Sequence, residues 1–260
     1  MTPVTFVEHD PADKRSAVMY QAGAARYAAT VVMAEAEDGV QVPISLVSRR
    51  DRKSPGPVLL NVYGCYGKSR WPSFFPWPPS MTKRLSLLDR GIAFGNVHVR
   101  GGGELGRPWH DAACRDRKRI TYTDLIAAAE GLVEQGVATR DGIVIEGASA
   151  VGGTVLAAAA VLRPELFRAA LAEVPLENTL DTEMDFTMPY ALPEAAEYGD
   201  RHIAHEYRYL RSYDPYHNLS ANRHFRQRTS TPHPMTVRCS ITSRSVRGAA
   251  SVVRPIATPG

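Results

Sequence analysis

The stretch Ile143-Val-Ile-Glu-Gly-Ala-Ser149-Ala-Val-Gly-Gly153 decides the fold. It begins as a short apolar strand, and an alanine-rich helical pattern follows at residues 154–162. Small residues beside Ser149 let the backbone turn sharply between strand and helix, the arrangement called a nucleophile elbow. Val151 stands where the second glycine of that motif belongs. Ser149 is therefore a candidate nucleophile, and the alternative is a plain turn in which its hydroxyl only caps the helix.

Patterns on both sides of this turn repeat the alternation of strand and helix. Apolar or alternating runs predict strands at residues 39–47, 56–63, 92–99 and 169–174, and helical spacing predicts a helix at 123–133. This alternation of strands and helices is typical of a mostly parallel sheet with helices on both faces. The fold class is therefore α/β.

Composition excludes several classes of protein. The 260 residues are 44% apolar and carry a net charge of +4, and no run is long enough for a membrane span or a signal peptide. We therefore expect a cytoplasmic protein without a membrane partner. Cys65, Cys114 and Cys239 lie at no metal-ligand spacing, which predicts neither a disulfide framework nor a metal site. The glycines of Arg100-Gly-Gly-Gly-Glu-Leu-Gly106 lack a following Lys-Ser or Lys-Thr, so a tight loop is favoured over a cofactor site.

The positive charge is confined to the C-terminal segment. Residues 215–260 contain seven arginines and no lysine or acid, whereas the first 214 residues carry 24 basic and 27 acidic side chains. The arginines follow no helical or strand period, and lysine is absent, so we expect no nucleic-acid partner. We expect this segment to be irregular and to leave a sheet edge open.

Several longer motifs, taken together, resemble the catalytic domain of the prolyl oligopeptidase family of serine peptidases, and within it the oligopeptidase B branch. They include Tyr63-Gly-Cys-Tyr-Gly67 and Ser212-Tyr-Asp-Pro-Tyr-His-Asn218. The others occupy residues 38–47, 85–91, 98–106, 124–130 and 163–167. The resemblance implies an α/β-hydrolase fold that is incomplete on its C-terminal side. It divides the chain into 1–37, similar to the end of a propeller and its linker, a catalytic domain at 38–222, and a tail at 223–260.

The same resemblance implies a role for each site residue. Ser149 would attack a peptide carbonyl, and the Ala150 amide and the Tyr63 hydroxyl would stabilise the oxyanion, with no cofactor. Glu194 falls on one of two acidic positions with which the oligopeptidase B branch binds Arg or Lys of a peptide substrate, but Ala196 occupies the other. The alternative for Glu194 and Glu197 is a solvated helical face.

No segment after residue 218 matches the family's motifs for the triad Asp and His. The histidines downstream of Ser149 lie at 202, 205, 217, 224 and 233, and all are expected to be surface or loop residues. Asp214 is expected to be structural. Three hypotheses stay open: a serine peptidase, an inactive remnant of the same fold, and an α/β-hydrolase esterase.

A reading-frame change would explain the unusual tail. The Met235 codon ends in G and any Thr codon begins with AC, so the frame that starts inside the Met235 codon reads GAC, an Asp. With favourable synonymous codons, the next residues resemble the family's segment around the triad Asp. We therefore expect the tail to be out of frame and the chain as given to lack peptidase activity.

Overall fold

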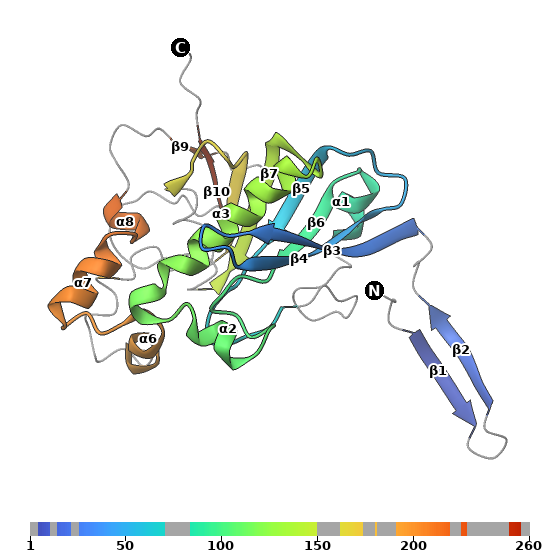
Figure 1. The fold of residues 1–260 in the computed structure, drawn as a ribbon. Helices are drawn as coiled ribbons and strands as arrows, with labels where there is room; N and C mark the ends of the chain where they lie inside the picture. The colour runs from blue at the N-terminus through green and yellow to red at the C-terminus, as the bar shows by residue number, and fades with distance from the viewer. Residues whose placement is uncertain are drawn as a thin grey trace, which may run out of the picture.

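The computed structural model describes residues 5–10, 15–21, 26–70, 84–149, 162–173, 180, 191–218, 225–227 and 250–255. Two strands, β1 (Thr5–Asp10) and β2 (Arg15–Gln21), pair antiparallel in a separate sheet. The main sheet has eight strands in the order β3-β4-β6-β5-β7-β8-β10-β9 (Figure 1). No helix among the described residues is long and apolar enough to cross a membrane.

The centre of the main sheet is parallel and both of its sides are antiparallel. Parallel pairs join β6 (Ala93–Val97), β5 (Gly56–Asn61), β7 (Ala138–Ala148) and β8 (Ala169–Glu173). On one side, β4 (Gln41–Arg49) and β3 (Tyr27–Glu35) continue the sheet antiparallel. The predicted α/β-hydrolase fold is confirmed, and its sheet is mixed, with the parallel order limited to the four central strands.

Segments from both ends of the chain pair with the strands of the central domain. β3 lies within residues 1–37, which the resemblance assigns to a propeller end and linker, yet it pairs along its whole length with β4 of the main sheet. On the other side, β10 (Ala250–Pro255) pairs antiparallel with β8 and with β9 (Phe225–Gln227). The prediction of an irregular tail that leaves this edge open is therefore wrong for these two segments.

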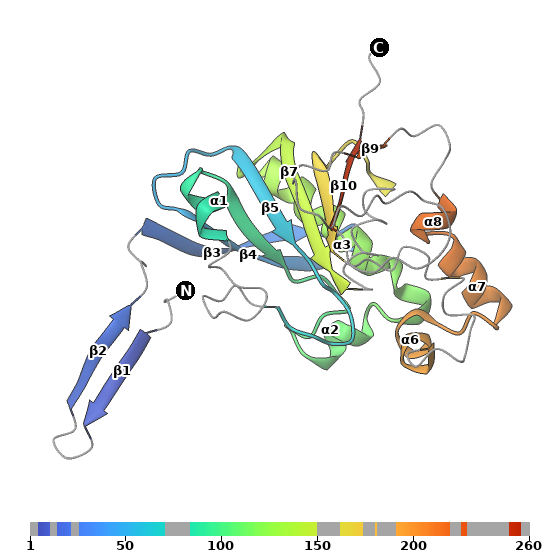
Figure 2. The same ribbon diagram turned by 180° about the vertical axis from the view of Figure 1, so that it is seen from behind.

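Helices cover both faces of the sheet (Figure 2). On one face, α3 (Arg119–Glu134) packs its buried side, including Tyr122, Leu125 and Leu132, over the larger core cluster. On the other face, Leu88 of α1 (Leu85–Asp89) packs with Val47, Leu59 and Phe94. Because side chains alternate along a strand, the neighbouring residues Leu59 and Leu60 of β5 enter different clusters.

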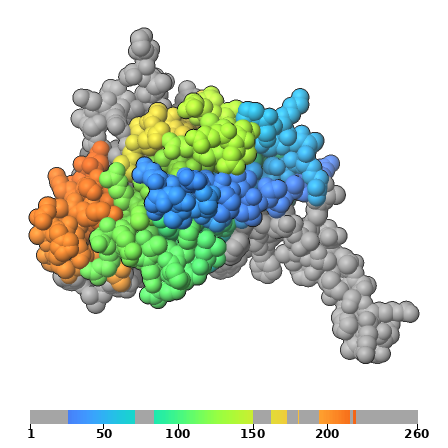
Figure 3. All heavy atoms as spheres, viewed as in Figure 1, coloured from blue at the N-terminus to red at the C-terminus, as the bar shows by residue number. Residues whose placement is uncertain are grey.

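The remaining helices gather beside the start of α3. They are α2 (Arg107–Asp111), a 3-10 turn (Arg115–Arg117), α6 (Ala191–Tyr198), α7 (Ala204–Arg211) and α8 (Pro215–Asn218). The surface of the orange segment that holds α6, α7 and α8 lies against the green surface of the segment that holds α2 (Figure 3). Segments about 80 residues apart in the chain therefore share one side of the molecule.

Candidate active site

Ser149 follows directly on β7, at the carboxyl edge of the parallel centre. Its φ is 73°, a left-handed conformation that a non-glycine residue adopts at a cost of order 1–3 kcal/mol and that is frequent at functional sites. Its side chain is exposed. β7 therefore ends directly before Ser149, which lies at an exposed position with a strained backbone. Ala150 and most of the predicted helix after it lie outside the described residues.

Tyr63 lies two residues after the end of the neighbouring strand β5. Val62, just beyond the end of β5, donates its backbone N–H to the carbonyl of Glu146 in β7, so the two strand ends stay side by side. The Tyr63 phenol lies close enough to Ser149 for the serine to lower the pKa of the phenol. Burial raises the pKa of the Tyr63 phenol, and the nearby Arg70 and Ser149 reduce this rise. The phenol is therefore a neutral hydrogen-bond donor at neutral pH.

The glycine-rich loop after β6 holds the Tyr63 segment in place. A Cβ added at Gly103 would lie 2.0 Å from the carbonyl oxygen of Gly67, and one at Gly101 would lie 2.4 Å from that of Gly64. The backbone N–H of Gly67 donates to the carbonyl of Gly101, and that of Gly103 donates to the carbonyl of Lys68. The glycines serve close backbone packing, so the loop supports the segment that carries Tyr63.

Glu194 lies on α6 and is buried, with 8% of its surface exposed. The Tyr66 hydroxyl donates a hydrogen bond to one carboxylate oxygen, and the other oxygen is buried with no hydrogen-bond partner among the described residues. Burial raises the pKa of Glu194, and the Tyr66 bond only partly offsets this. The charge of Glu194 also raises the pKa of Tyr63. Ala196, at the second acidic position of the branch, is exposed.

The sequence did not single out Lys118, which is completely buried. Its ammonium donates to the carbonyl of Gly64 at 3.0 Å and to Glu197 Oε1 at 2.6 Å. Lys118 thereby ties the start of α3 to α6 and to the Tyr63 loop. Glu197 is only 3% exposed, so the alternative of a solvated face for Glu194 and Glu197 is wrong. No local pattern around Lys118 indicates this, because its partners come from distant segments.

The described histidines downstream of Ser149 have acidic neighbours close in the sequence. His202 Nδ1 lies 3.1 Å from Asp200, and His205 is largely exposed. His217 Nδ1 lies 2.7 Å from the buried Asp214, which also accepts the backbone N–H of His217. Asp214 therefore has a structural role at the start of α8, as expected.

Two further histidines and two cysteines complete the set of candidate residues. His224 and His233 lie outside the described residues, as does Cys239. Cys65 is buried, and burial raises the pKa of its thiol to about 12. This thiol is therefore protonated at neutral pH and a poor nucleophile.

Comparisons with known proteins agree on one family. The sequence profile of the "Prolyl oligopeptidase family" matches residues 79–232. An uncharacterized peptidase of Sinorhizobium fredii is 71% identical over 228 residues, which cover 86% of this chain and 30% of that protein. Protease 2 of Moraxella lacunata is 36% identical over 190 residues, covering 72% of this chain and 26% of that one.

Comparison with solved structures indicates the same family. Oligopeptidase B from Leishmania major superposes with a TM-score of 0.74 at 34% identity, covering 84% of this chain and 30% of that chain. The chain spans between about a quarter and a third of the length of the relatives that it matches.

Proposed function

The chain belongs to the prolyl oligopeptidase family of serine peptidases, and we propose that Ser149 is the nucleophile of a peptidase site. One observation carries this proposal: Ser149 is exposed at a strained backbone position after β7, and the Tyr63 phenol lies near enough for the serine to lower the pKa of the phenol. A serine that only capped a helix would need neither this strain nor a buried phenol beside it.

In the proposed reaction, Ser149 Oγ bonds to the carbonyl carbon of a peptide while its proton passes to a base. The carbonyl electrons move onto the oxygen, and Tyr63 donates a hydrogen bond to the resulting oxyanion. The amide of Ala150 is the second donor implied by the family resemblance. The C–N bond then breaks, the amine leaves with the proton, and water hydrolyses the remaining ester.

We propose that Glu194 binds an Arg or Lys side chain of the peptide. Its unpartnered oxygen is buried, and a carboxylate in that position gains from a cation that supplies hydrogen bonds. The raised pKa of Glu194 supports this proposal, because it shows that the apo site lacks full compensation for the charge. With Ala196 at the second position, one carboxylate acts alone, so we expect a weaker preference for basic residues than two would confer.

The general base is the part that the described residues do not supply. Among the described residues, no histidine after Ser149 is hydrogen bonded to it, and these histidines contact acidic groups at residues 200, 206 and 214 instead. This observation favours a second candidate, a catalytically inactive form of the same fold. Loss of the base typically costs on the order of a millionfold in turnover.

Labelling with a fluorophosphonate probe separates these candidates, because only an activated serine hydroxyl reacts. The full chain is compared with Ser149→Ala as the blank and with Tyr63→Phe. Labelling that is lost in Ser149→Ala and falls by about 10²- to 10³-fold in Tyr63→Phe would support a working site. Labelling no greater than that of Ser149→Ala would establish the inactive form.

Substrate assays with the same proteins address specificity. Fluorogenic peptides with Arg or Gln before the scissile bond, and a simple aryl ester, are offered in parallel. Hydrolysis of the Arg peptide that weakens in Glu194→Gln would support the assignment of Glu194. Hydrolysis of the ester alone would instead support the esterase hypothesis and refute the peptidase proposal.

A further inference from the structure

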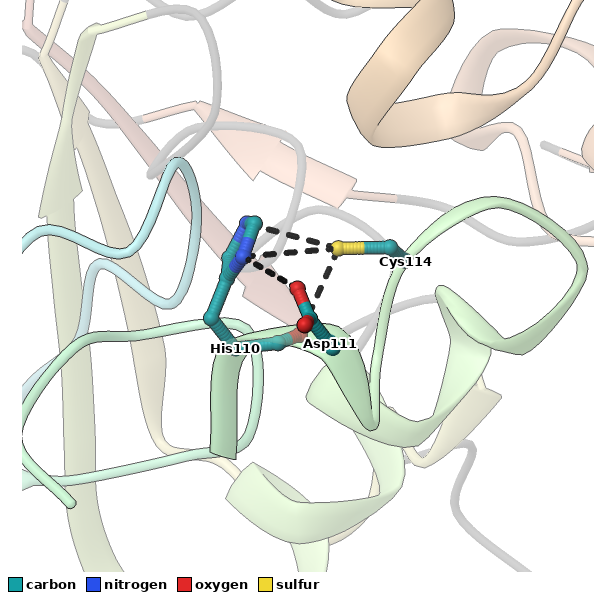
Figure 4. A group of neighbouring side chains, drawn as sticks. All are labelled: His110, Asp111 and Cys114. Carbon is teal, nitrogen blue, oxygen red and sulfur yellow. Dashed lines mark hydrogen bonds and ion pairs between the residues drawn. The ribbon is translucent and has the colours of Figure 1, made fainter. Parts of the chain in front are cut away.

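A second cluster of chemically active side chains lies between α2 and α6. His110, Asp111 and Cys114 offer donor atoms that lie within 4.8 Å of one another (Figure 4). Glu197 adds a fourth donor from α6, with Oε2 lying 2.9 Å from His110 Nε2. The peptidase proposal uses none of these four groups.

Three of the donor atoms form a compact triangle. His110 Nε2 lies 3.3 Å from Cys114 Sγ, and Glu197 Oε2 lies 2.9 Å and 4.0 Å from these two atoms. Around a tetrahedral Zn²⁺ with ordinary bond lengths, the same pairs of N, S and O ligands would be roughly 3.4–3.6 Å apart. Shifts of about half an ångström would therefore place all three at bonding distance from one ion.

Outer groups hold two of these ligands in the orientation that a metal requires. Asp111 Oδ1 lies 3.1 Å from His110 Nδ1 and can accept the Nδ1 proton, so a metal that replaces the proton between Nε2 and Glu197 would meet the Nε2 lone pair. Lys118 donates to Oε1 of Glu197, the oxygen that the triangle does not use. Carboxylates that orient a ligating histidine in this way are a regular feature of zinc sites.

We propose that His110, Cys114 and Glu197 bind one Zn²⁺ ion, with water as the fourth ligand. A nitrogen, sulfur and oxygen donor set suits Zn²⁺ better than the hard ions Mg²⁺ and Ca²⁺. The solvent side of the site is open enough for water, since the side chains of His110 and Asp111 are 17% and 49% exposed. Binding converts the Cys114 thiol to a metal thiolate and releases its proton to solvent.

The ion would link α2 to α6. Glu197 lies one helical turn after Glu194, so a metal held by Glu197 would fix the helix that carries Glu194. This site does not depend on the assignment of Ser149. Its test therefore uses metal binding and stability as readouts, and activity is not needed.

The experiment uses the full chain, freed of metal with a chelator and titrated with ZnCl₂ by calorimetry. We expect one ion per chain and a rise in melting temperature. Cys114→Ser should lose more than the roughly 10- to 100-fold in affinity expected for the outer-group variant Asp111→Asn. Cys239→Ser and His205→Gln serve as matched controls and should bind as the unmodified chain does.

Cobalt substitution gives a second readout. Co²⁺ bound to a thiolate shows a charge-transfer absorption band in the near ultraviolet, and this band should be absent in Cys114→Ser and present in Cys239→Ser. Equal binding by these two variants, or no Zn²⁺ binding at micromolar concentrations, would overturn the proposal and leave the cluster as a hydrogen-bonded network only. Asp111 is half exposed, so its variant should fold and can be compared directly.

Discussion

Lys118 and Glu197 form a buried ion pair whose removal tests the packing around the site. The two side chains are 0% and 3% exposed and their charged atoms are 2.6 Å apart. Lys118→Met would leave the Glu197 carboxylate buried without its ammonium partner, and would also remove the donor to the carbonyl of Gly64. Glu197→Gln would leave a buried ammonium instead.

Solvent scarcely screens this pair, so most of the cost of an uncompensated buried charge applies, although His110 still contacts the other oxygen of Glu197 at 2.9 Å. Each single variant should lose about 3–5 kcal/mol of unfolding free energy. For a urea dependence of roughly 3 kcal/mol per molar, the midpoint of unfolding should fall by about 1–2 M. The double variant Lys118→Met/Glu197→Gln should cost about 1–3 kcal/mol less than the sum of the singles, since it leaves no charge unpaired.

Urea unfolding followed by circular dichroism measures these values at neutral pH. Arg163→Gln is the control: the Arg163 side chain is 41% exposed in its pairs with Glu130 and Glu165, so the midpoint should hardly move. A loss below about 1 kcal/mol in both single variants of the buried pair, or strict additivity in the double variant, would refute the reasoning.

The pH dependence of the pair has a definite sign. Burial raises the pKa of Glu197, but the charge and hydrogen bond of Lys118 outweigh burial, and the net pKa lies below the ordinary value of 4.5. The pair therefore stabilises the fold above about pH 4.5, and this contribution is lost as the pH falls through the lower pKa of the folded state. Lys118→Met should show a smaller loss of stability over that acid range.

Three further predictions concern other parts of the chain. Gly103→Ala should lose about 1–3 kcal/mol of stability in urea unfolding, because its Cβ would lie 2.0 Å from the Gly67 carbonyl oxygen. Gly142→Ala should lose less, because its Cβ meets a side-chain hydroxyl that can rotate away. Glu194→Gln should raise the melting temperature at pH 7, because a carboxyl with a raised pKa destabilises the fold when ionised; an advantage that persists below pH 4 would contradict this. Sequencing the gene should find, in the frame that begins inside the Met235 codon, Asp-Arg followed by an open stretch with a further His, and a stop codon directly after would end the frame-change hypothesis.

Local patterns in the sequence determined the elements of the parallel centre. Apolar runs predicted β5, β6, β7 and β8, because a strand buried on both faces is apolar throughout. Helical spacing predicted α3, because a helix buried on one side repeats its apolar residues every three to four positions. The sequence also predicted a turn out of the strand at Ser149, since glycine and alanine beside a serine serve a sharp turn. Tyr63 near Ser149 required the family resemblance.

Only the tertiary structure decided which charged groups are buried and what they contact. Glu194 and Glu197 lie one turn apart on α6, a spacing that by itself is typical of a solvated face. Their burial comes with contacts to α2, Lys118 and the Tyr63 loop, which are distant in the chain. The spacing of His110 and Cys114 alone did not indicate a metal site, because the third donor lies 83 residues beyond Cys114. The same holds for β10, whose arginine-rich surroundings gave no strand period although it pairs with β8. The period of apolar residues shows which side of a segment is buried. Ion pairs, donor clusters and strand pairing at a sheet edge depend also on distant segments, which only the fold brings into contact.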